Sequence, residues 1–230
     1  MPEGLRQRLD GIRERINKAA VRAGRNPEEI TLVAVSKTFD AASVQRAIEA
    51  GVIHLGENYI QEASEKISAI DSPGVKWHMI GHLQSNKARL AVQLFDYIHT
   101  IDNVKLVERL DRIAGELHRN PSVLVQVDLG HEATKAGAEE HMLPEIIATL
   151  DNADNLNMIG LMTMPPLFLE AEQTREYFIR LREICDSINS SRPQTSRFKE
   201  LSMGMSHDFE VAIEEGATMI RIGTAIFGQR

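Results

Sequence analysis

Short apolar runs alternate with segments of helical periodicity along most of the chain. The runs are rich in β-branched residues, and turn residues mark most of the junctions. Several runs lack strict apolar–polar alternation, which is typical of parallel strands that are covered on both faces. The pattern predicts eight strands, at residues 31–36, 52–56, 77–81, 97–101, 122–129, 158–163, 200–203 and 219–223.

Segments of helical periodicity fill the intervals between these strands, and one more precedes the first strand. We expect Asp40 and Asp102 to cap the N-termini of two of these helices, and Gly51 to follow the end of the first. A further helix is expected to start at Ser206. The predicted helices are 4–24, 41–51, 58–70, 86–95, 103–118, 138–150, 169–188 and 206–216.

Eight strands joined by helices over 230 residues predict an α/β fold, a single (β/α)8 TIM barrel with an extra N-terminal helix. We expect one domain, residues 1–230. The main rival is an open doubly wound sheet, which usually carries a glycine-rich turn after its first strand. Here that turn reads "SKTFD", and no G-x-G-x-x-G or P-loop pattern occurs in the sequence. The barrel is therefore the favoured fold.

Composition limits the kinds of partner and the cellular compartment that we expect for this protein. The formal net charge of −7 argues against nucleic acid, and no stretch is long and apolar enough to span a membrane. The N-terminal residues contain no apolar leader, and Cys185 is the single cysteine, so no internal disulfide is possible. We expect a cytoplasmic protein. The arginines of helix 4–24 form either a solvated face or a docking surface for an acidic partner.

In a barrel of this kind, chemistry is located at the carboxyl ends of the strands. The first strand runs through "TLVAVSKTFD" and delivers Lys37 to that end. Burial makes a lysine lose its proton more readily, and a neutral amine can form a Schiff base with a carbonyl compound. The alternative is a rim lysine that is paired with a carboxylate.

The loops after strands seven and eight are the usual phosphate site of this architecture. "SMGMSHD" offers Ser206 near a helix start, and "RIGTAIFG" offers Gly223 and Thr224. Each alone is compatible with ordinary capping. Both together, on one rim with Lys37, indicate pyridoxal 5'-phosphate. Arg221 would then lie near the cofactor ring, where it can only donate a hydrogen bond; alternatively, it is a strand-end arginine in a salt bridge.

The sequence gives weaker support for a catalytic or metal-binding role at the other candidate residues. His78 and His82 would be roughly 13 Å apart on a strand, too far for one metal ion. Trp77 is interpreted as a packing residue, and Cys185 has no evident histidine partner for catalysis. Asp128 is either a rim acid or a residue that orients neighbouring loops.

Seven segments of the chain together resemble the pyridoxal phosphate homeostasis proteins, over roughly residues 5–230. They read "LVAVSK", "GENYIQEA", "WHMIGHLQSNK", "HTIDN", "LVQVDLGHEATKAG", "GLMTMPP" and "LSMGMSHDFEVAIEEGATMIRIGTAIFG". The resemblance implies a barrel like the N-terminal domain of alanine racemase, with pyridoxal phosphate attached to Lys37. It implies phosphate contacts from Ser206, Gly223 and Thr224, a ring-nitrogen contact from Arg221, and Asn58 near the cofactor.

The resemblance also implies a function. Members of the family are regarded as carriers or regulators of the cofactor in vitamin B6 and amino-acid homeostasis, without an established catalytic turnover. We therefore expect a non-enzymatic monomer whose partners are pyridoxal phosphate and PLP-dependent apo-enzymes. One alternative is a racemase-like enzyme, which needs a second base that alanine racemases take from an extra β-domain; this sequence ends at Arg230, after the eighth strand. The other is an aldolase-like barrel.

Overall fold

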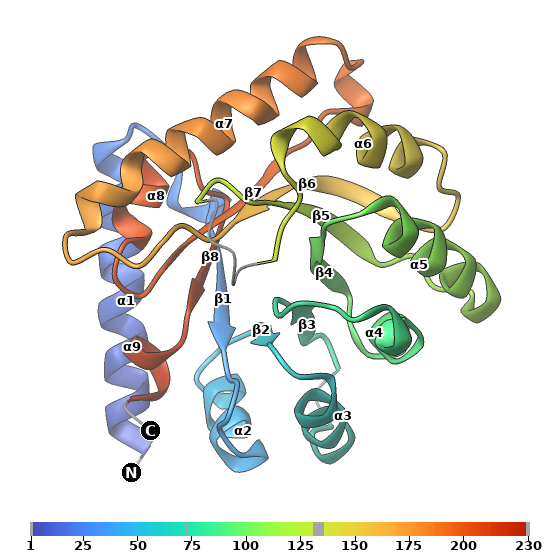
Figure 1. Ribbon diagram of the computed structural model, residues 1–230. Coiled ribbons are helices and arrows are strands. Elements are labelled where there is room, and N and C mark those ends of the chain that lie inside the picture. Colours follow the sequence, from blue (N-terminus) through green and yellow to red (C-terminus); the bar gives the residue numbers. More distant parts are fainter. Residues whose placement is uncertain (1, 72, 131–135, 229–230) are drawn as a thin grey trace.

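The eight predicted strands close into a barrel in the computed structural model, which describes residues 2–71, 73–130 and 136–228 (Figure 1). All pairs are parallel, each strand pairs with the next along the chain, and β8 closes on β1. The predicted (β/α)8 barrel is confirmed. The strands are β1 (Thr31–Val35), β2 (His54–Glu57), β3 (Lys76–Met79), β4 (Tyr97–Ile101), β5 (Ser122–Val127), β6 (Asn157–Thr163), β7 (Glu200–Met205) and β8 (Met219–Ile222).

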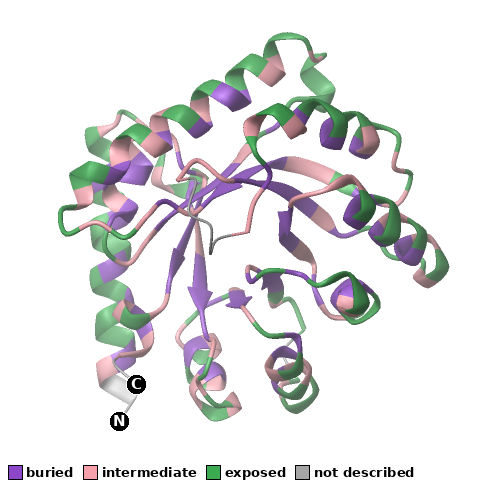
Figure 2. Ribbon diagram, in the orientation of Figure 1, coloured by how far each residue is buried: buried purple, intermediate pink, exposed green. Residues whose placement is uncertain are grey.

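Helices surround the barrel and turn their apolar faces toward it, so buried positions line the inner side of the helical layer (Figure 2). Five short 3-10 turns occur in the described part of the chain, at Pro27–Glu29, Ser85–Lys87, Glu140–Met142, Ala171–Thr174 and Gln194–Ser196. The α-helices are α1 (Pro2–Arg22), α2 (Ala41–Glu49), α3 (Ile60–Ala69), α4 (Ala88–Leu94), α5 (Val104–Leu117), α6 (Leu143–Asp151), α7 (Arg175–Ser190), α8 (Phe209–Glu214) and α9 (Thr224–Phe227).

Several predicted helix starts are wrong, and one helix was not predicted. Helices α6 and α7 begin at Leu143 and Arg175 rather than at 138 and 169, because a 3-10 turn precedes each of them. Asn103, rather than Asp102, caps α5, because its side chain accepts a hydrogen bond from the Leu106 N–H at 2.9 Å. Helix α8 begins at Phe209 instead of Ser206. A carboxylate oxygen of Asp208 accepts the Met205 N–H at 2.6 Å and closes a turn before the helix starts. The unpredicted helix is α9.

The N-terminal helix α1 covers the seam where the barrel closes. Its apolar positions, such as Leu9 and Ile12, are buried against the barrel layer. Arg15 donates two hydrogen bonds to Glu210 of α8, at 3.1 and 2.8 Å, and Arg8 donates to the carbonyl of Ile226 in α9 at 2.8 Å. Several of its arginines therefore hold the last elements of the fold in place. None of the helices in the described ranges is both long and apolar enough to cross a membrane.

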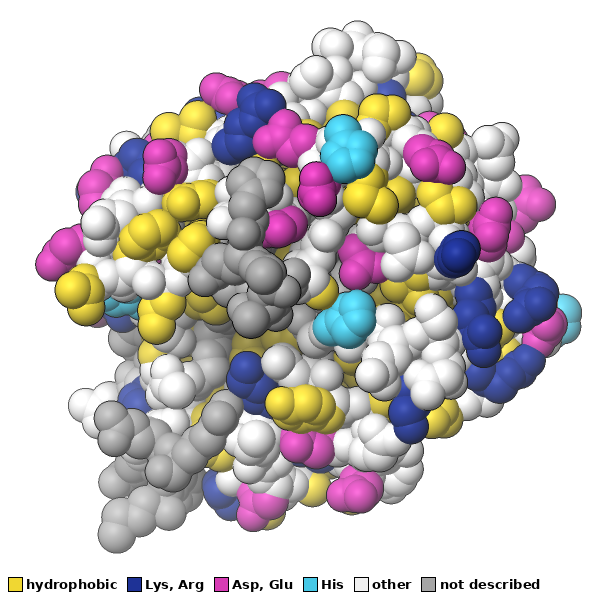
Figure 3. Space-filling model, viewed as in Figure 1, with side chains coloured by type: hydrophobic (Ala, Val, Ile, Leu, Met, Phe, Trp, Pro, Cys, Tyr) yellow, Lys and Arg dark blue, Asp and Glu magenta, His cyan; other side chains and the backbone are white. Residues whose placement is uncertain are grey.

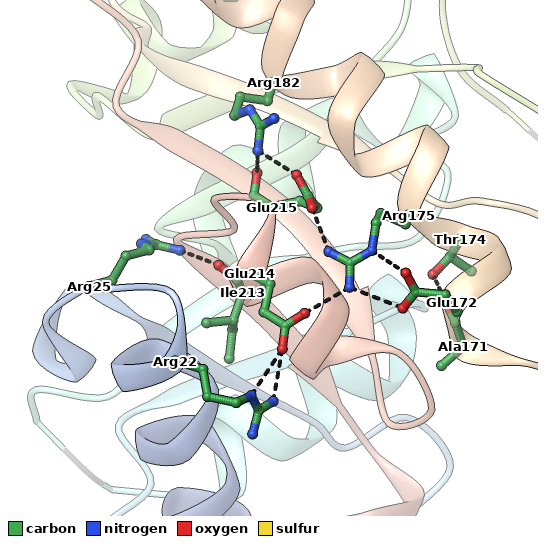
Figure 4. A network of polar contacts seen from close by, with 10 residues as sticks. All are labelled: Arg22, Arg25, Ala171, Glu172, Thr174, Arg175, Arg182, Ile213, Glu214 and Glu215. Carbon is green, nitrogen blue, oxygen red and sulfur yellow. Dashed lines mark hydrogen bonds and ion pairs between the residues drawn. The ribbon is translucent and has the colours of Figure 1, made fainter.

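A network of ion pairs joins α1, α7 and α8 on the outside of the barrel (Figure 4). Arg175, at the start of α7, donates to Glu172, Glu214 and Glu215, and Arg22 of α1 donates to Glu214 at 2.9 Å. Single exposed ion pairs stabilise a fold very little, but these share carboxylates and restrain one another. The network fixes α8, and α8 follows the loop that carries Ser206.

The barrel interior contains histidines among its apolar side chains. His78 of β3 and His99 of β4 are both fully buried, and Nδ1 of His78 lies 2.8 Å from Nε2 of His99. The His78 ring also stacks on Tyr97, with 4.2 Å between the ring centroids. Burial lowers the pKa of His99 to about 3 and holds the pKa of His78 well below its usual range, and neighbouring positive or titratable groups add to both effects. Both rings are therefore neutral near pH 7.

These rings should make the fold sensitive to acid. The unfolded chain binds protons on its histidines below about pH 6.5, whereas the buried rings stay neutral, so stability present above that pH is lost as the pH falls toward the folded pKa. Each such histidine should lower the free energy of unfolding by about 1.4 kcal/mol per pH unit in this range. Urea unfolding measures this free energy between about pH 7 and about pH 5. It should fall less steeply with decreasing pH in His99→Asn than in the wild type. The exposed control His141→Asn should decline as the wild type does, and equal slopes in all three proteins would contradict the prediction.

Candidate functional site

One cavity at the carboxyl end of the barrel brings the predicted site residues together. Its volume is about 460 Å³, and its lining comes mainly from the ends of β1, β2, β3, β7 and β8 and from the loops that follow them. All six residues predicted from the sequence contribute to the lining: Lys37, Asn58, Ser206, Arg221, Gly223 and Thr224. Residues from opposite ends of the chain therefore face one space.

A larger hollow of about 700 Å³ lies elsewhere, between α6 and α7 on the outer surface. Its lining includes Leu143, Ile147 and Ile184, together with charged side chains at the rim such as Arg180. It contains no strand end. The cavity at the barrel mouth is the better candidate because polar groups from several strands converge there, as in ligand sites generally.

The turn after β1 holds Lys37 at this cavity. Thr38 adopts a left-handed backbone conformation with φ of 67°, which is uncommon for a residue other than glycine. Its N–H donates to Glu62 of α3 at 2.8 Å, and the Phe39 N–H closes the turn on the Ser36 carbonyl at 3.1 Å. Backbone strain of this kind persists only where the surroundings enforce it, and it is concentrated at functional sites.

A buried ion pair lies beneath this turn and was not predicted. Nζ of Lys66 donates to the Glu57 carboxylate at 2.6 Å and to the Ser36 carbonyl at 2.8 Å, and the Ser36 hydroxyl donates to the same carboxylate oxygen at 2.6 Å. Burial raises the pKa of the Glu57 carboxyl, while the hydrogen bonds from Lys66 and Ser36 oppose that rise. The Glu57 side chain lies wholly inside the barrel wall.

Gly81 makes room for Asn58. The two residues follow adjacent strands, β3 and β2, and a Cβ atom on Gly81 would lie 2.3 Å from the carbonyl oxygen of Asn58. The Gly81 carbonyl also accepts a hydrogen bond from the Thr100 hydroxyl at 2.9 Å. No other residue type fits at position 81 without displacing Asn58, so this glycine belongs to the site although the sequence analysis passed over it.

Arg221 places a positive charge at the inner end of the cavity. One guanidinium nitrogen donates to the Ser202 hydroxyl at 2.6 Å and another donates to the Thr163 carbonyl at 2.9 Å. Burial lowers the pKa of Arg221 to about 10, and the nearby carboxylate of Asp208 opposes that shift, so the group is charged at neutral pH. Among the described residues, its side chain is held by polar neighbours in the barrel, and no carboxylate forms the strand-end salt bridge that was the alternative.

Ser206, Gly223 and Thr224 form the side of the cavity where β7 and β8 end. Ser206 lies in a turn before α8 rather than at the predicted start of that helix. Helix α9 begins at Thr224, and the first N–H groups of a helix have no carbonyl partner within it. These donors and two hydroxyl groups suit an anionic oxygen group.

Further residues line the cavity besides the six predicted to bind a cofactor. His82, which was considered only as a metal ligand, and His207 add imidazole rings, and Phe39, Met164 and Leu167 add apolar surface. Phe39 stacks on Phe227 of α9, with 5.0 Å between the ring centroids. Their shared signal was position, because each lies within a few residues of a strand end.

The structure also gives positions for the remaining candidate residues where it describes them. His78 lies inside the barrel and His82 is exposed, and no group of three His, Cys, Asp or Glu side chains in the described ranges could hold a metal ion. Trp77 packs in the core. Cys185 is buried in α7, and burial raises the pKa of its thiol to about 11. Asp128 accepts the Gly130 N–H at 3.2 Å, and the segment 131–135 of one family motif lies outside the described residues.

Comparison with known proteins identifies the class to which this barrel belongs. The family model described as "Alanine racemase, N-terminal domain" matches residues 7–230. The pyridoxal phosphate homeostasis protein of Escherichia coli is 42% identical over 226 residues, covering 96% of this chain and 95% of that protein. The protein of the same name from Aquifex aeolicus is 39% identical and covers 97% of both chains.

A solved structure agrees with these relatives. PipY of Synechococcus elongatus with PLP bound is 41% identical and superposes with a TM-score of 0.86, covering 97% of this chain and all of that one. The chain belongs to the family of the pyridoxal phosphate homeostasis proteins.

The close approach of Gly81 to Asn58 leads to a prediction on stability. Gly81→Ala should lower the free energy of unfolding by about 1–3 kcal/mol, because the new methyl group overlaps the Asn58 backbone. The matched control is Gly11→Ala on α1, where an added Cβ has nothing within 4 Å and should stabilise the helix by about 0.5–1 kcal/mol. Urea unfolding measures both, and a Gly81→Ala protein as stable as the wild type would contradict this packing.

Proposed function

We propose that this protein binds pyridoxal 5'-phosphate and serves vitamin B6 and amino-acid homeostasis. The observation that carries the proposal is the convergence of Lys37, Arg221 and the donors near Thr224 on one cavity of about 460 Å³. An amine, a phosphate-binding rim and a charged donor are the groups that this cofactor needs. The volume lies within the range of small-molecule sites.

Each group at the cavity has a place in this proposal. Bound pyridoxal phosphate supplies an aldehyde that can bond covalently to an amine. Lys37 supplies that amine at its Nζ atom, while Ser206, Gly223 and Thr224 hold the phosphate. Asn58 lies beside the cofactor, where Gly81 fixes its backbone.

Arg221 favours binding over turnover. A pyridoxal enzyme that needs a strong electron sink usually places an acid at the ring nitrogen. The guanidinium is charged and has no acceptor, so it can only donate to that nitrogen. The nitrogen then stays unprotonated and withdraws electrons less strongly. We therefore propose a cofactor-binding protein rather than an enzyme.

Racemase-like activity is the alternative function. A two-base racemase needs a proton-transferring group on each face of the cofactor, and in alanine racemases one of them is a tyrosine. Within the described residues, no tyrosine lines the cavity: Tyr59 is 56% exposed, Tyr97 packs on His78, and Tyr177 lies against Phe168. His82 and His207 do line the cavity and are the groups that such an enzyme would use.

The partners and the working unit are part of the same proposal. Residues 1–230 would act as one barrel domain and as a monomer in the cytoplasm, and PLP-dependent apo-enzymes would receive the cofactor. Leu167 lines the cavity and is 85% exposed, and Leu169 is 91% exposed. Hydrophobic side chains gather on the side of the barrel mouth where the segment between β6 and α7 runs (Figure 3). An acceptor protein would meet this surface next to the cofactor.

Cofactor attachment can be read from the absorbance spectrum. Mixing the purified protein with pyridoxal phosphate should give a visible band that free cofactor lacks, and borohydride reduction should leave the added mass on the peptide containing Lys37. Lys37→Ala should lose both signals. The matched control Lys199→Ala changes an exposed lysine outside the cavity lining and should keep both. A wild-type protein without the band would overturn the proposal.

Turnover can be tested separately from binding. The loaded protein, incubated with single L-amino acids, should form no D-isomer above a control that contains pyridoxal phosphate alone. Chiral chromatography measures the two isomers over time. Steady production of the D-isomer that is lost in Lys37→Ala would favour the racemase-like alternative.

A further inference from the structure

A continuous line of polar side chains crosses the interior of the barrel. It begins at half-buried His54, whose Nδ1 lies 2.9 Å from Nε2 of His78. Nδ1 of His78 lies 2.8 Å from Nε2 of His99, and Nδ1 of His99 lies 2.9 Å from the hydroxyl oxygen of Ser202. Arg221 donates to that same oxygen at 2.6 Å. The line thus joins the starting end of β2 to the cavity at the opposite end of the barrel.

The three rings are neutral and carry one hydrogen each. Burial is the main cause that lowers the pKa of His54, of His78 and of His99, and the positive charge of Arg221 adds to it at His99. The charged groups acting on His54 are Lys76, which lowers its pKa further, and Asp96, which raises it. A neutral imidazole has one donor and one acceptor nitrogen, so all contacts in the line must run in one direction.

Ser202 decides which direction is correct. Among the described residues, its fully buried hydroxyl has two hydrogen-bond neighbours, Arg221 and His99. Arg221 can only donate, so the serine oxygen accepts from it. If His99 also donated to Ser202, the serine hydrogen would be left buried without an acceptor, which is unfavourable. The hydroxyl therefore donates to Nδ1 of His99.

This assignment sets every hydrogen in the line. His99 carries its hydrogen on Nε2 and donates to His78, and His78 does the same toward His54. The hydrogen on Nε2 of His54 then faces outward from a half-exposed position, where water can accept it. All hydrogens point away from the cavity, so the oxygen of Ser202 presents only lone pairs to Arg221.

We propose that His99, His78 and His54 are positioning residues that keep Ser202 an acceptor for Arg221 and so hold the guanidinium at the cofactor cavity. The line also connects the ring-nitrogen end of that cavity to the far end of the barrel. The positioning proposal rests on the proposed function for the identity of the ligand. The direction of the hydrogen bonds is independent of that function. If the line were reversed, Ser202 would accept from both His99 and Arg221, and its own hydrogen would be buried beside the guanidinium without an acceptor.

The direction can be measured on the full chain without any ligand. Two-bond ¹H–¹⁵N NMR spectra distinguish a nitrogen that carries hydrogen from one that does not. His99 and His78 should both show a protonated Nε2 and an unprotonated Nδ1 near neutral pH. A hydrogen on Nδ1 of His99 would overturn the inference, whether or not pyridoxal phosphate binds.

A pair of substitutions tests the positioning role. His99→Asn and His99→Leu both lose the contact with His78, but only the asparagine keeps an oxygen near the former Nδ1 as an acceptor for Ser202. His99→Leu should bind pyridoxal phosphate about tenfold more weakly, as loss of a buried hydrogen-bond partner predicts, and shift the absorbance maximum of the bound cofactor. His99→Asn should retain the wild-type maximum and most of the affinity. His141→Leu, which changes an exposed ring, is the control and should keep the affinity and the absorbance maximum of the wild type.

The outcomes separate the two proposals. Equal maxima and affinities in His99→Asn and His99→Leu, with both folded by circular dichroism, would show that Ser202 needs no acceptor and would overturn the positioning role. If the wild type binds no pyridoxal phosphate, the proposed function fails, and the NMR result still decides the direction of the line. If His99→Leu does not fold, Ser202→Ala serves instead and should give the same shift in the absorbance maximum.

Discussion

Closure of the sheet between β8 and β1 is the constraint on which the site depends. The register pairs Ala34 with Ile222, so Lys37 and Gly223 leave neighbouring strands at the same edge of the barrel. Because every strand is parallel and pairs with the next, the loops after β2, β3 and β7 reach that edge as well. Helix α1 reinforces the seam through its bonds to Glu210 and Ile226. A change that opened the seam would separate Lys37 from Gly223 before it disturbed the local backbone of either residue.

The interior of the barrel meets a second constraint. Branched apolar layers usually fill this space, and a polar group placed there must be hydrogen-bonded. Here the polar groups satisfy one another in sequence, from Arg221 through Ser202 to the histidines. The arrangement needs one charged donor, and Asp208 lies close enough to favour that charge. If only some of these buried polar groups were hydrogen-bonded, the barrel would be less stable than with an apolar core. The line therefore stabilises the fold only when it is complete.

The local pattern of the sequence was sufficient to predict the strands and their order, because apolar runs and turn residues are short-range signals. The same signals misplaced several helix starts. Asp102 and Asn103, or Ser206 and Asp208, are equally good caps until the turn geometry is known, and the pattern does not separate the 3-10 turns before α6 and α7 from the helices themselves. The six cavity residues were found because each lies at a strand end or in a family motif. Their roles toward a cofactor stay predictions. The histidine line was beyond reach because its members lie on different strands and meet only across the barrel.

Two separate interactions hold the end of the buried strand β1, and the ion pair beneath it is the first. Glu57 is the carboxylate that the strand ends enclose most completely, and an unpaired charge there would be very unfavourable. Lys66 from α3 meets it at 2.6 Å, and Ser36 adds its hydroxyl to the same oxygen. The buried negative charge is thus balanced from the helix layer. Lys37, one residue further along, is held instead by the strained turn at Thr38 and lines the cavity. Two lysines therefore lie near the end of β1: Lys66 is the counter-ion of Glu57, and Lys37 lines the cavity.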